Sequence, residues 1–81
     1  MKKEYLEWVA RKHGYSRAYE LLSQHHFPED LDAIDALREI AIEQVRGGHY
    51  SVYEKEIMVD EIKRTFRDYK DLLKMKYLDV V

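Results

Sequence analysis

The apolar residues of this 81-residue chain recur every three or four positions along most of its length, which is the spacing of one face of an α-helix. Glycine and proline interrupt this pattern at Gly14, at Pro28 and at the pair Gly47 and Gly48. No segment of useful length alternates apolar and polar residues as a β-strand does. The pattern therefore predicts an all-α fold, a compact bundle of three to four helices that forms a single domain over residues 1 to 81.

The N-terminal part of the pattern predicts a pair of short helices. Residues 3 to 13 place apolar side chains on one helical face, and Gly14 is suited to end this helix in a left-handed C-cap. Ser16 is suited to cap a second helix over residues 16 to 25. We expect the chain to bend at Gly14, and the helix pair to pack across the rest of the bundle.

The remaining residues predict an antiparallel helical hairpin that turns at Gly47 and Gly48. Its two arms are residues 29 to 46 and residues 52 to 77. Ser51 and Glu54 have the spacing of a capping box, in which the serine oxygen accepts a hydrogen bond from the glutamate amide. This hairpin is the expected frame of the bundle.

The two arms also predict a register. In a hairpin that turns at residue 49, positions whose numbers sum to about 98 lie side by side, because both helices rise by about 1.5 Å per residue. The rule joins apolar residues of one arm to apolar residues of the other, and acids to bases. The apolar pairs are Ala41 with Met58, Leu37 with Ile62 and Leu31 with Phe66, and the charged pairs are Glu43 with Lys55, Arg38 with Asp60, Asp35 with Lys63 and Asp32 with Arg67.

Composition narrows the environment of the chain. No apolar run reaches the length needed to cross a bilayer, and the first residues lack the apolar stretch of a signal peptide. We therefore expect a cytoplasmic protein without membrane contact. The absence of cysteine excludes disulfides and thiolate zinc sites.

Charge is distributed unevenly, although the net charge is only −2. Residues 27 to 50 carry two bases and six acids, whereas bases concentrate between Lys63 and Lys76. Two interpretations of this basic run stay open. It pairs with acids of the neighbouring helix and with the dipole of its own helix, or it faces an external anionic partner.

Residues 9 to 23 resemble the centre of a helix-turn-helix DNA-binding motif, with a small residue at Ala10 and a turn glycine at Gly14. The resemblance weakens beyond the turn, where Glu20 and Ser23 occupy positions that such a motif makes apolar. A DNA-binding transcriptional regulator is therefore the alternative function. Its contact residues would be Arg11, Lys12, Ser16 and Arg17.

The sequence offers little support for an enzyme or a metal site. It has no nucleophile motif and no glycine-rich phosphate loop. His25, His26 and His49 are candidates for a metal site, but adjacent histidines diverge on a helix, and histidine near a helix C-terminus already interacts with the dipole. We expect no catalytic residue, no metal, no cofactor and no small-molecule substrate.

The main functional signal is a surplus of aromatic residues, seven of which are tyrosines. A core of this size cannot bury them all, and tyrosine is common in protein interfaces. The second arm of the hairpin also outruns the first by eight residues, about 12 Å, so its apolar tail needs a cover from the N-terminal helix or from a second chain. We therefore predict a non-catalytic interaction module or regulator that binds a protein partner or forms a homodimer. The predicted interface residues are Tyr5, Trp8, Tyr69, Leu72, Leu73, Tyr77 and Leu78.

Overall fold

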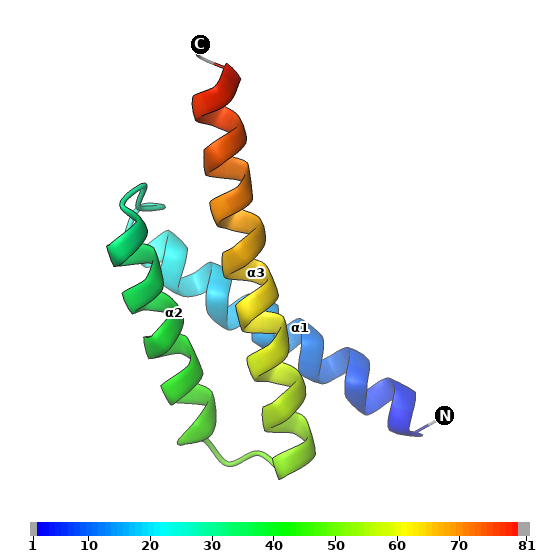
Figure 1. Cartoon of the computed structure of the whole chain (residues 1–81). Coiled ribbons are helices and arrows are strands. Elements are labelled where there is room, and N and C mark those ends of the chain that lie inside the picture. The colour runs from blue at the N-terminus through cyan, green and yellow to red at the C-terminus, as the bar shows by residue number, and fades with distance from the viewer. Residues whose placement is uncertain (1, 80–81) are drawn as a thin grey trace.

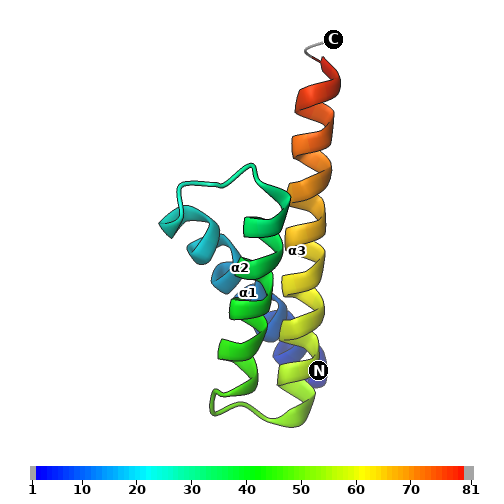
Figure 2. The same ribbon diagram turned by 60° about the vertical axis from the view of Figure 1, so that its left-hand side comes forward.

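The computed structural model describes the backbone of residues 2 to 79 and the side chains of residues 2 to 76. These residues form three helices, α1 (Lys2–Gln24), α2 (Leu31–Arg46) and α3 (Val52–Asp79), and no strand (Figure 1). Helices α2 and α3 run side by side in opposite directions, and α1 packs obliquely against both (Figure 2). The predicted all-α bundle is confirmed. None of the three helices has the length and apolar content required to cross a membrane.

The N-terminal segment is one continuous helix, so the predicted break at Gly14 into helices 3 to 13 and 16 to 25 was wrong. Gly14 is buried where α1 crosses α3, and a Cβ atom at this position would lie 2.7 Å from the backbone oxygen of Met58. Ala10 and Ala18, four residues before and after Gly14, are buried as well. Glycine costs an isolated helix about 1 kcal/mol relative to alanine. Here it permits the close approach of two helices and does not reverse the chain.

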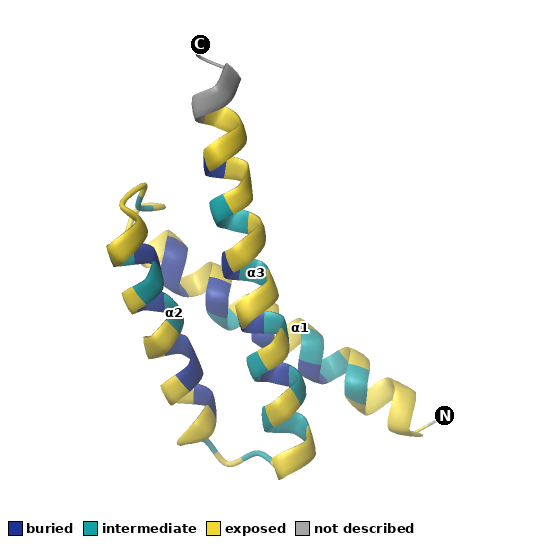
Figure 3. Ribbon diagram, in the orientation of Figure 1, coloured by how far each residue is buried: buried dark blue, intermediate teal, exposed yellow. Residues whose placement is uncertain are grey.

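The core lies between α2 and α3 and under the second half of α1 (Figure 3). Helices α2 and α3 supply all the large side chains that are fully buried, whereas α1 supplies two alanines and two leucines. The described residues include no buried polar or charged side chain. The core residues are Ala10, Ala18, Leu21, Leu22, Ile34, Leu37, Ala41, Ile42, Val45, Met58, Ile62, Phe66 and Leu73.

The ends of the hairpin helices agree with their capping signals. Asp30 precedes α2 and accepts a hydrogen bond from the amide of Ala33 at 3.2 Å. Ser51 precedes α3 and accepts from the amide of Glu54 at 3.1 Å, while its hydroxyl donates to the Glu54 carboxylate at 3.0 Å. The predicted capping box therefore forms, with the carboxylate on the serine hydroxyl rather than on its amide.

The ion pairs that join α3 to α2 and to the turn before α2 follow another register than the one predicted. Lys70 pairs with Asp35, and Lys76 pairs with Glu29 at 3.0 Å, so the residue numbers of both pairs sum to 105. Side chains of an α-helix lean toward its N-terminus. In an antiparallel pair of helices, the side chains of the two helices therefore lean in opposite directions. Two side-chain tips meet when the Cα atom of each residue lies closer to the C-terminus of its own helix than the point of contact does. The predicted register compared the positions of backbone atoms along the two helices and did not account for the lean of the side chains.

The predicted partners accordingly form other contacts. Arg38 pairs with Asp35 and with Glu39 on its own helix. Leu31, which was predicted to pack against Phe66, is 51% exposed. The other charged residues of the predicted pairs form different contacts: Asp60 with Arg11 and Arg64, Arg67 with Asp68, and Lys55 with the backbone oxygen of Arg46. The residues of the other two predicted apolar pairs, Ala41 with Met58 and Leu37 with Ile62, are all buried in the core.

Candidate functional site

A hollow lies on the described surface between the second half of α1 and the middle of α3. It has a volume of about 550 Å³ and is lined mainly by aromatic and apolar side chains. We call it the aromatic cleft. Its defining residues are Tyr15 and Tyr19 of α1, Phe27 of the following turn, and Tyr69 and Leu72 of α3.

The aromatic rings of the cleft form a continuous row. Tyr15 and Tyr19 are stacked with their centroids 6.2 Å apart, the Tyr19 ring meets the Phe27 ring edge-on at 5.7 Å, and Phe27 lies 6.5 Å from Tyr69. Tyr15, Tyr19 and Phe27 are 42 to 51% exposed, and Leu72 is 63% exposed. A contiguous apolar surface of this kind on a small protein indicates a binding site.

An unusual backbone turn places Phe27 in the row. His26 and Phe27 have φ angles of 58° and 51°, a left-handed conformation that is uncommon for residues other than glycine. The amide of Phe27 donates to the carbonyl of Leu22 at 2.7 Å, which closes the end of α1. Two consecutive residues in this conformation store strain, and strain of this kind concentrates at functional sites.

Tyr69 joins the two walls of the cleft. Its hydroxyl donates to the backbone oxygen of Pro28 at 2.6 Å. Burial raises the pKa of the Tyr69 hydroxyl, Glu29 raises the pKa further, and Lys76 opposes this change. The hydroxyl therefore keeps its proton and remains a donor, so α3 stays tied to the turn that carries Phe27.

The rim of the cleft is charged and nearly balanced. Glu61, Arg64, Arg67 and Asp68 of α3 line its outer edge, two acids and two bases. An apolar centre surrounded by a polar rim is the composition of a protein interface.

The predicted interface residues of α3 fall into three groups. Tyr69 and Leu72 line the aromatic cleft, as an interface role requires. Leu73 is only 9% exposed, because it packs in the core, and it is not available to a partner. Tyr77 and Leu78 lie outside the residues whose side chains are described.

The two predicted interface residues of α1 lie elsewhere. Tyr5 and Trp8 are 65% and 59% exposed, with their rings 6.4 Å apart. The ammonium of neighbouring Lys3 lies over the ring of Tyr53, so this end of α1 adjoins the start of α3. Of the two covers considered for the end of α3, the start of the N-terminal helix with Tyr5 and Trp8 does not provide one, since α1 and α3 run in the same general direction (Figure 1).

Sequence reasoning missed the aromatic residues of α1 and of its turn. Tyr15 and Tyr19 are four residues apart and so share one helical face, next to the face of Ala10, Gly14 and Ala18. The assumed break at Gly14 separated these tyrosines from the first helix and hid their common face.

The helix-turn-helix interpretation does not fit the structure, because residues 9 to 23 lie within one helix without a turn. Arg11 pairs with acids of α1 and α3, including Glu61 at 3.4 Å. Arg17 donates to Gln44 of α2 at 3.4 Å, and the Lys12 ammonium lies 5.2 Å from the centre of the Trp8 ring. Ser16 is exposed in mid-helix and caps nothing.

Among the described residues, no group of three or more His, Cys, Asp or Glu side chains is placed to hold a metal ion. His25, His26 and His49 lie in the turns that follow α1 and α2.

No protein-family model matches the chain, and no significant match is found among curated proteins or among solved structures. The functional proposal for this protein therefore rests on the composition and shape of its surfaces.

Proposed function

We propose that the protein is a non-catalytic helical interaction module that forms a homodimer through the aromatic cleft. The observation that carries the proposal is the row of half-exposed rings in the aromatic cleft. Further along α3, the exposed apolar side chains of Leu72 and Met75 follow Tyr69 at three-residue intervals, and Met75 is 60% exposed. Protein interfaces favour tyrosine, phenylalanine and methionine at their centres. Such a surface is stable in water when a partner covers it.

The shape of α3 supports a second copy as that partner. The last turns of α3 project beyond α2 and α1 (Figure 2). In a two-fold arrangement, the projecting end of each α3 packs into the cleft of the other chain, and the same surface is used twice. The rim suits such a contact, because Arg64 and Arg67 of one chain can face Glu61 and Asp68 of the other without net repulsion.

Sedimentation equilibrium tests the proposal with a matched pair of substitutions. Leu72→Glu places a charge on the projecting surface, and Leu6→Glu makes the same change at the start of α1, where Leu6 is 47% exposed. We expect the wild-type chain and Leu6→Glu to be dimeric at about 100 µM, and Leu72→Glu to be monomeric, because a buried unpaired charge is strongly destabilising.

Two results would reject a homodimer formed through the aromatic cleft. A wild-type chain that stays monomeric at this concentration leaves the cleft to a different protein. A dimer that survives Leu72→Glu but not Leu6→Glu places the contact around Tyr5 and Trp8. Circular dichroism of both variants verifies that each remains helical.

A further inference from the structure

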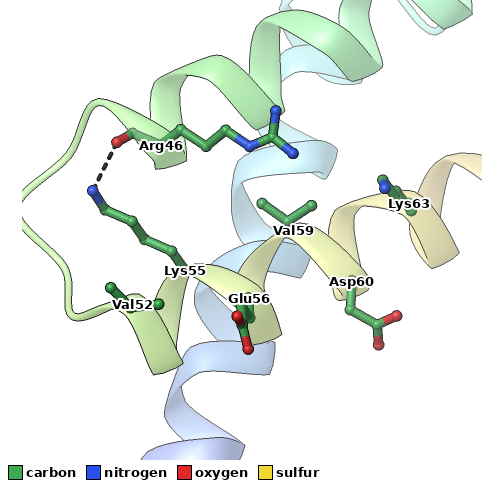
Figure 4. Close-up of a pocket in the computed structure, with 7 residues that line it drawn as sticks. All are labelled: Arg46, Val52, Lys55, Glu56, Val59, Asp60 and Lys63. Carbon is green, nitrogen blue, oxygen red and sulfur yellow. Dashed lines mark hydrogen bonds between the residues drawn. The ribbon is translucent and has the colours of Figure 1, made fainter.

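Helices α2 and α3 border a second surface, made of two adjoining hollows that share Asp60 and Lys63. The first hollow, of about 300 Å³, is shown in Figure 4 and is lined by Arg46, Val52, Lys55, Glu56, Val59, Asp60 and Lys63. The second, of about 460 Å³, is lined by Arg38, Asp60, Lys63, Arg64, Phe66, Arg67 and Lys70. We call the two together the basic groove.

Positive charge is concentrated in the basic groove. Seven of the chain's 14 lysines and arginines line it, but only two of its 16 acids do. The molecule as a whole carries a formal charge of −2. Three further acids, Asp35, Glu39 and Asp68, do not line the groove but pair with its bases Arg38, Arg67 and Lys70. The excess of bases over acids in the lining indicates an anionic ligand.

Three of the basic side chains that line the groove are the least neutralised. Within the described residues, the side chains of Arg46 and Lys63 form no ion pair. Arg67 has only its sequence neighbour Asp68, at 3.8 Å, and both side chains are about two thirds exposed. The basic run of α3 is therefore only partly used inside the fold.

The groove is long and open. From Lys55 to Lys70 it follows fifteen residues of α3, a length of about 22 Å. Lys63, Arg67 and Lys70 are three and four residues apart, so their charges succeed one another along a single helical stripe. This layout fits an extended chain of negative charges better than a compact anion.

Only three of the residues that line the groove are apolar. They are Val52, which is 75% exposed, Val59, which is half-buried, and Phe66, which is 1% exposed. A protein interface needs an apolar centre from which charged residues are depleted. Nucleic acid needs no such centre, because release of counterions from its phosphates drives binding.

We propose that the basic groove binds the phosphate backbone of single-stranded nucleic acid without reading its bases. A flexible strand can follow the groove, whereas a rigid duplex would also meet the exposed acids Asp32, Glu39 and Glu43 on α2. The net charge of the molecule does not prevent this binding. At physiological salt the Debye length is about 8 Å, so a strand in the groove responds to the groove charges and little to acids on distant surfaces.

Fluorescence anisotropy with a labelled 20-nucleotide oligothymidylate tests this proposal. We expect log K to fall with log salt concentration with a slope of about −2, because about three phosphates meet Arg46, Lys63 and Arg67 at about 0.7 per phosphate. Lys63→Glu should weaken binding about tenfold and make the slope shallower by about 0.7. Lys63 does not line the aromatic cleft, so this variant leaves the surface of the proposed dimer intact.

Lys12→Glu is the matched control. It changes the net charge by the same amount on α1, where Lys12 is exposed, and we expect it to leave the affinity for the oligonucleotide within about twofold. If Lys12→Glu weakens binding as much as Lys63→Glu does, the effect is one of net charge and the groove is not the site.

Three further results would overturn the proposal. They are the absence of oligonucleotide binding by the wild-type chain at about 50 mM salt, a higher affinity for a 20-base-pair duplex than for the single strand, and equal binding of polyglutamate of the same length. The last result would assign the groove to an acidic protein segment. Arg64 and Arg67 line both the basic groove and the aromatic cleft, so the titration is repeated with the Leu72→Glu variant, in which the proposed dimer contact is removed. Binding by that variant shows whether the groove acts without the homodimer, so the two proposals can fail separately.

Discussion

Helix α3 has two contacts that are built in opposite ways. Against α1 it packs on small residues, Ala10, Gly14 and Ala18, which let the two backbones approach closely. Against α2 it packs large side chains, among them Ile34 and Phe66, that fill the space between helices held further apart. The contact with α1 depends on the absence of large side chains, and the contact with α2 depends on their presence. Enlarging a side chain therefore disturbs the first contact, whereas shortening a side chain disturbs the second.

The two contacts also produce different surfaces. Because α1 crosses α3 obliquely, the helices diverge on one side of Gly14, and aromatic rings line the opening that results. Helix α2 runs alongside α3, and long basic side chains border the two hollows of the basic groove. The two neighbours of α3 thus leave hollows of different composition beside it, although Arg64 and Arg67 line both.

The largest expected loss of stability comes from truncating a large side chain between α2 and α3. Phe66 is 1% exposed, and Phe66→Ala removes most of a buried ring. We expect the free energy of unfolding to fall by about 3 to 5 kcal/mol, through lost transfer energy and the cavity that remains. Urea denaturation followed by circular dichroism measures this loss. Leu31→Ala, at a position that is 51% exposed, should change stability much less, and equal losses would contradict the assigned core.

A smaller loss of stability is expected from enlarging a small residue where α1 crosses α3. Gly14→Ala adds a Cβ atom 2.7 Å from the Met58 oxygen, so the variant should lose about 1 to 3 kcal/mol although alanine favours helices. Gly47→Ala is the control, because its nearest new contact is 3.4 Å away and its φ is −84°. Urea denaturation should show the first variant destabilised and the second close to wild type. A Gly14→Ala variant more stable than wild type would show that α1 does not cross α3 at this residue.

The smallest effect concerns the ion pair of Asp35 with Lys70 at the edge of the contact between α2 and α3. The hydrogen bond from Lys70 lowers the pKa of the Asp35 carboxyl below its usual value of 3.8, against some opposing desolvation. A carboxyl with a lowered pKa in the folded state stabilises the fold above its ordinary pKa, and this contribution is lost as the pH falls through the lowered value. Wild type should therefore lose more stability than Asp35→Asn between about pH 4 and pH 2.5.

Urea midpoints measured across that range test this expectation. Asp71→Asn is the control, since Asp71 is exposed and forms no ion pair among the described residues. Parallel acid profiles for wild type and Asp35→Asn would show that the pair contributes nothing to folding.

Local signals in the sequence predicted the hairpin well. The cap at Ser51 depends on a hydrogen bond within three residues, so its chemistry is readable before the chain is folded. The cap at Asp30 was not predicted, and the first arm begins at Leu31 rather than at residue 29. The predicted apolar pairs of the hairpin likewise placed Ile62 and Phe66 on the inner face of the second arm, and both residues are buried.

The candidate site was predicted less completely. Tyr69 and Leu72 were expected at an interface, and both line the aromatic cleft. Tyr15, Tyr19 and Phe27 were not expected there, because their row depends on a continuous α1 and on the left-handed turn at His26 and Phe27. Neither feature has a signal in residue type alone, since glycine breaks some helices and packs within others.

The sequence by itself determined the all-α class, the two arms of the hairpin and the stripe that each buries, because helix periodicity and capping act over a few residues. Only the tertiary structure decided what Gly14 does, which acids face which bases, and where aromatic and basic residues gather. These depend on the angle at which two helices cross and on the lean of side chains across a contact. Both are properties of the packed assembly rather than of any one segment.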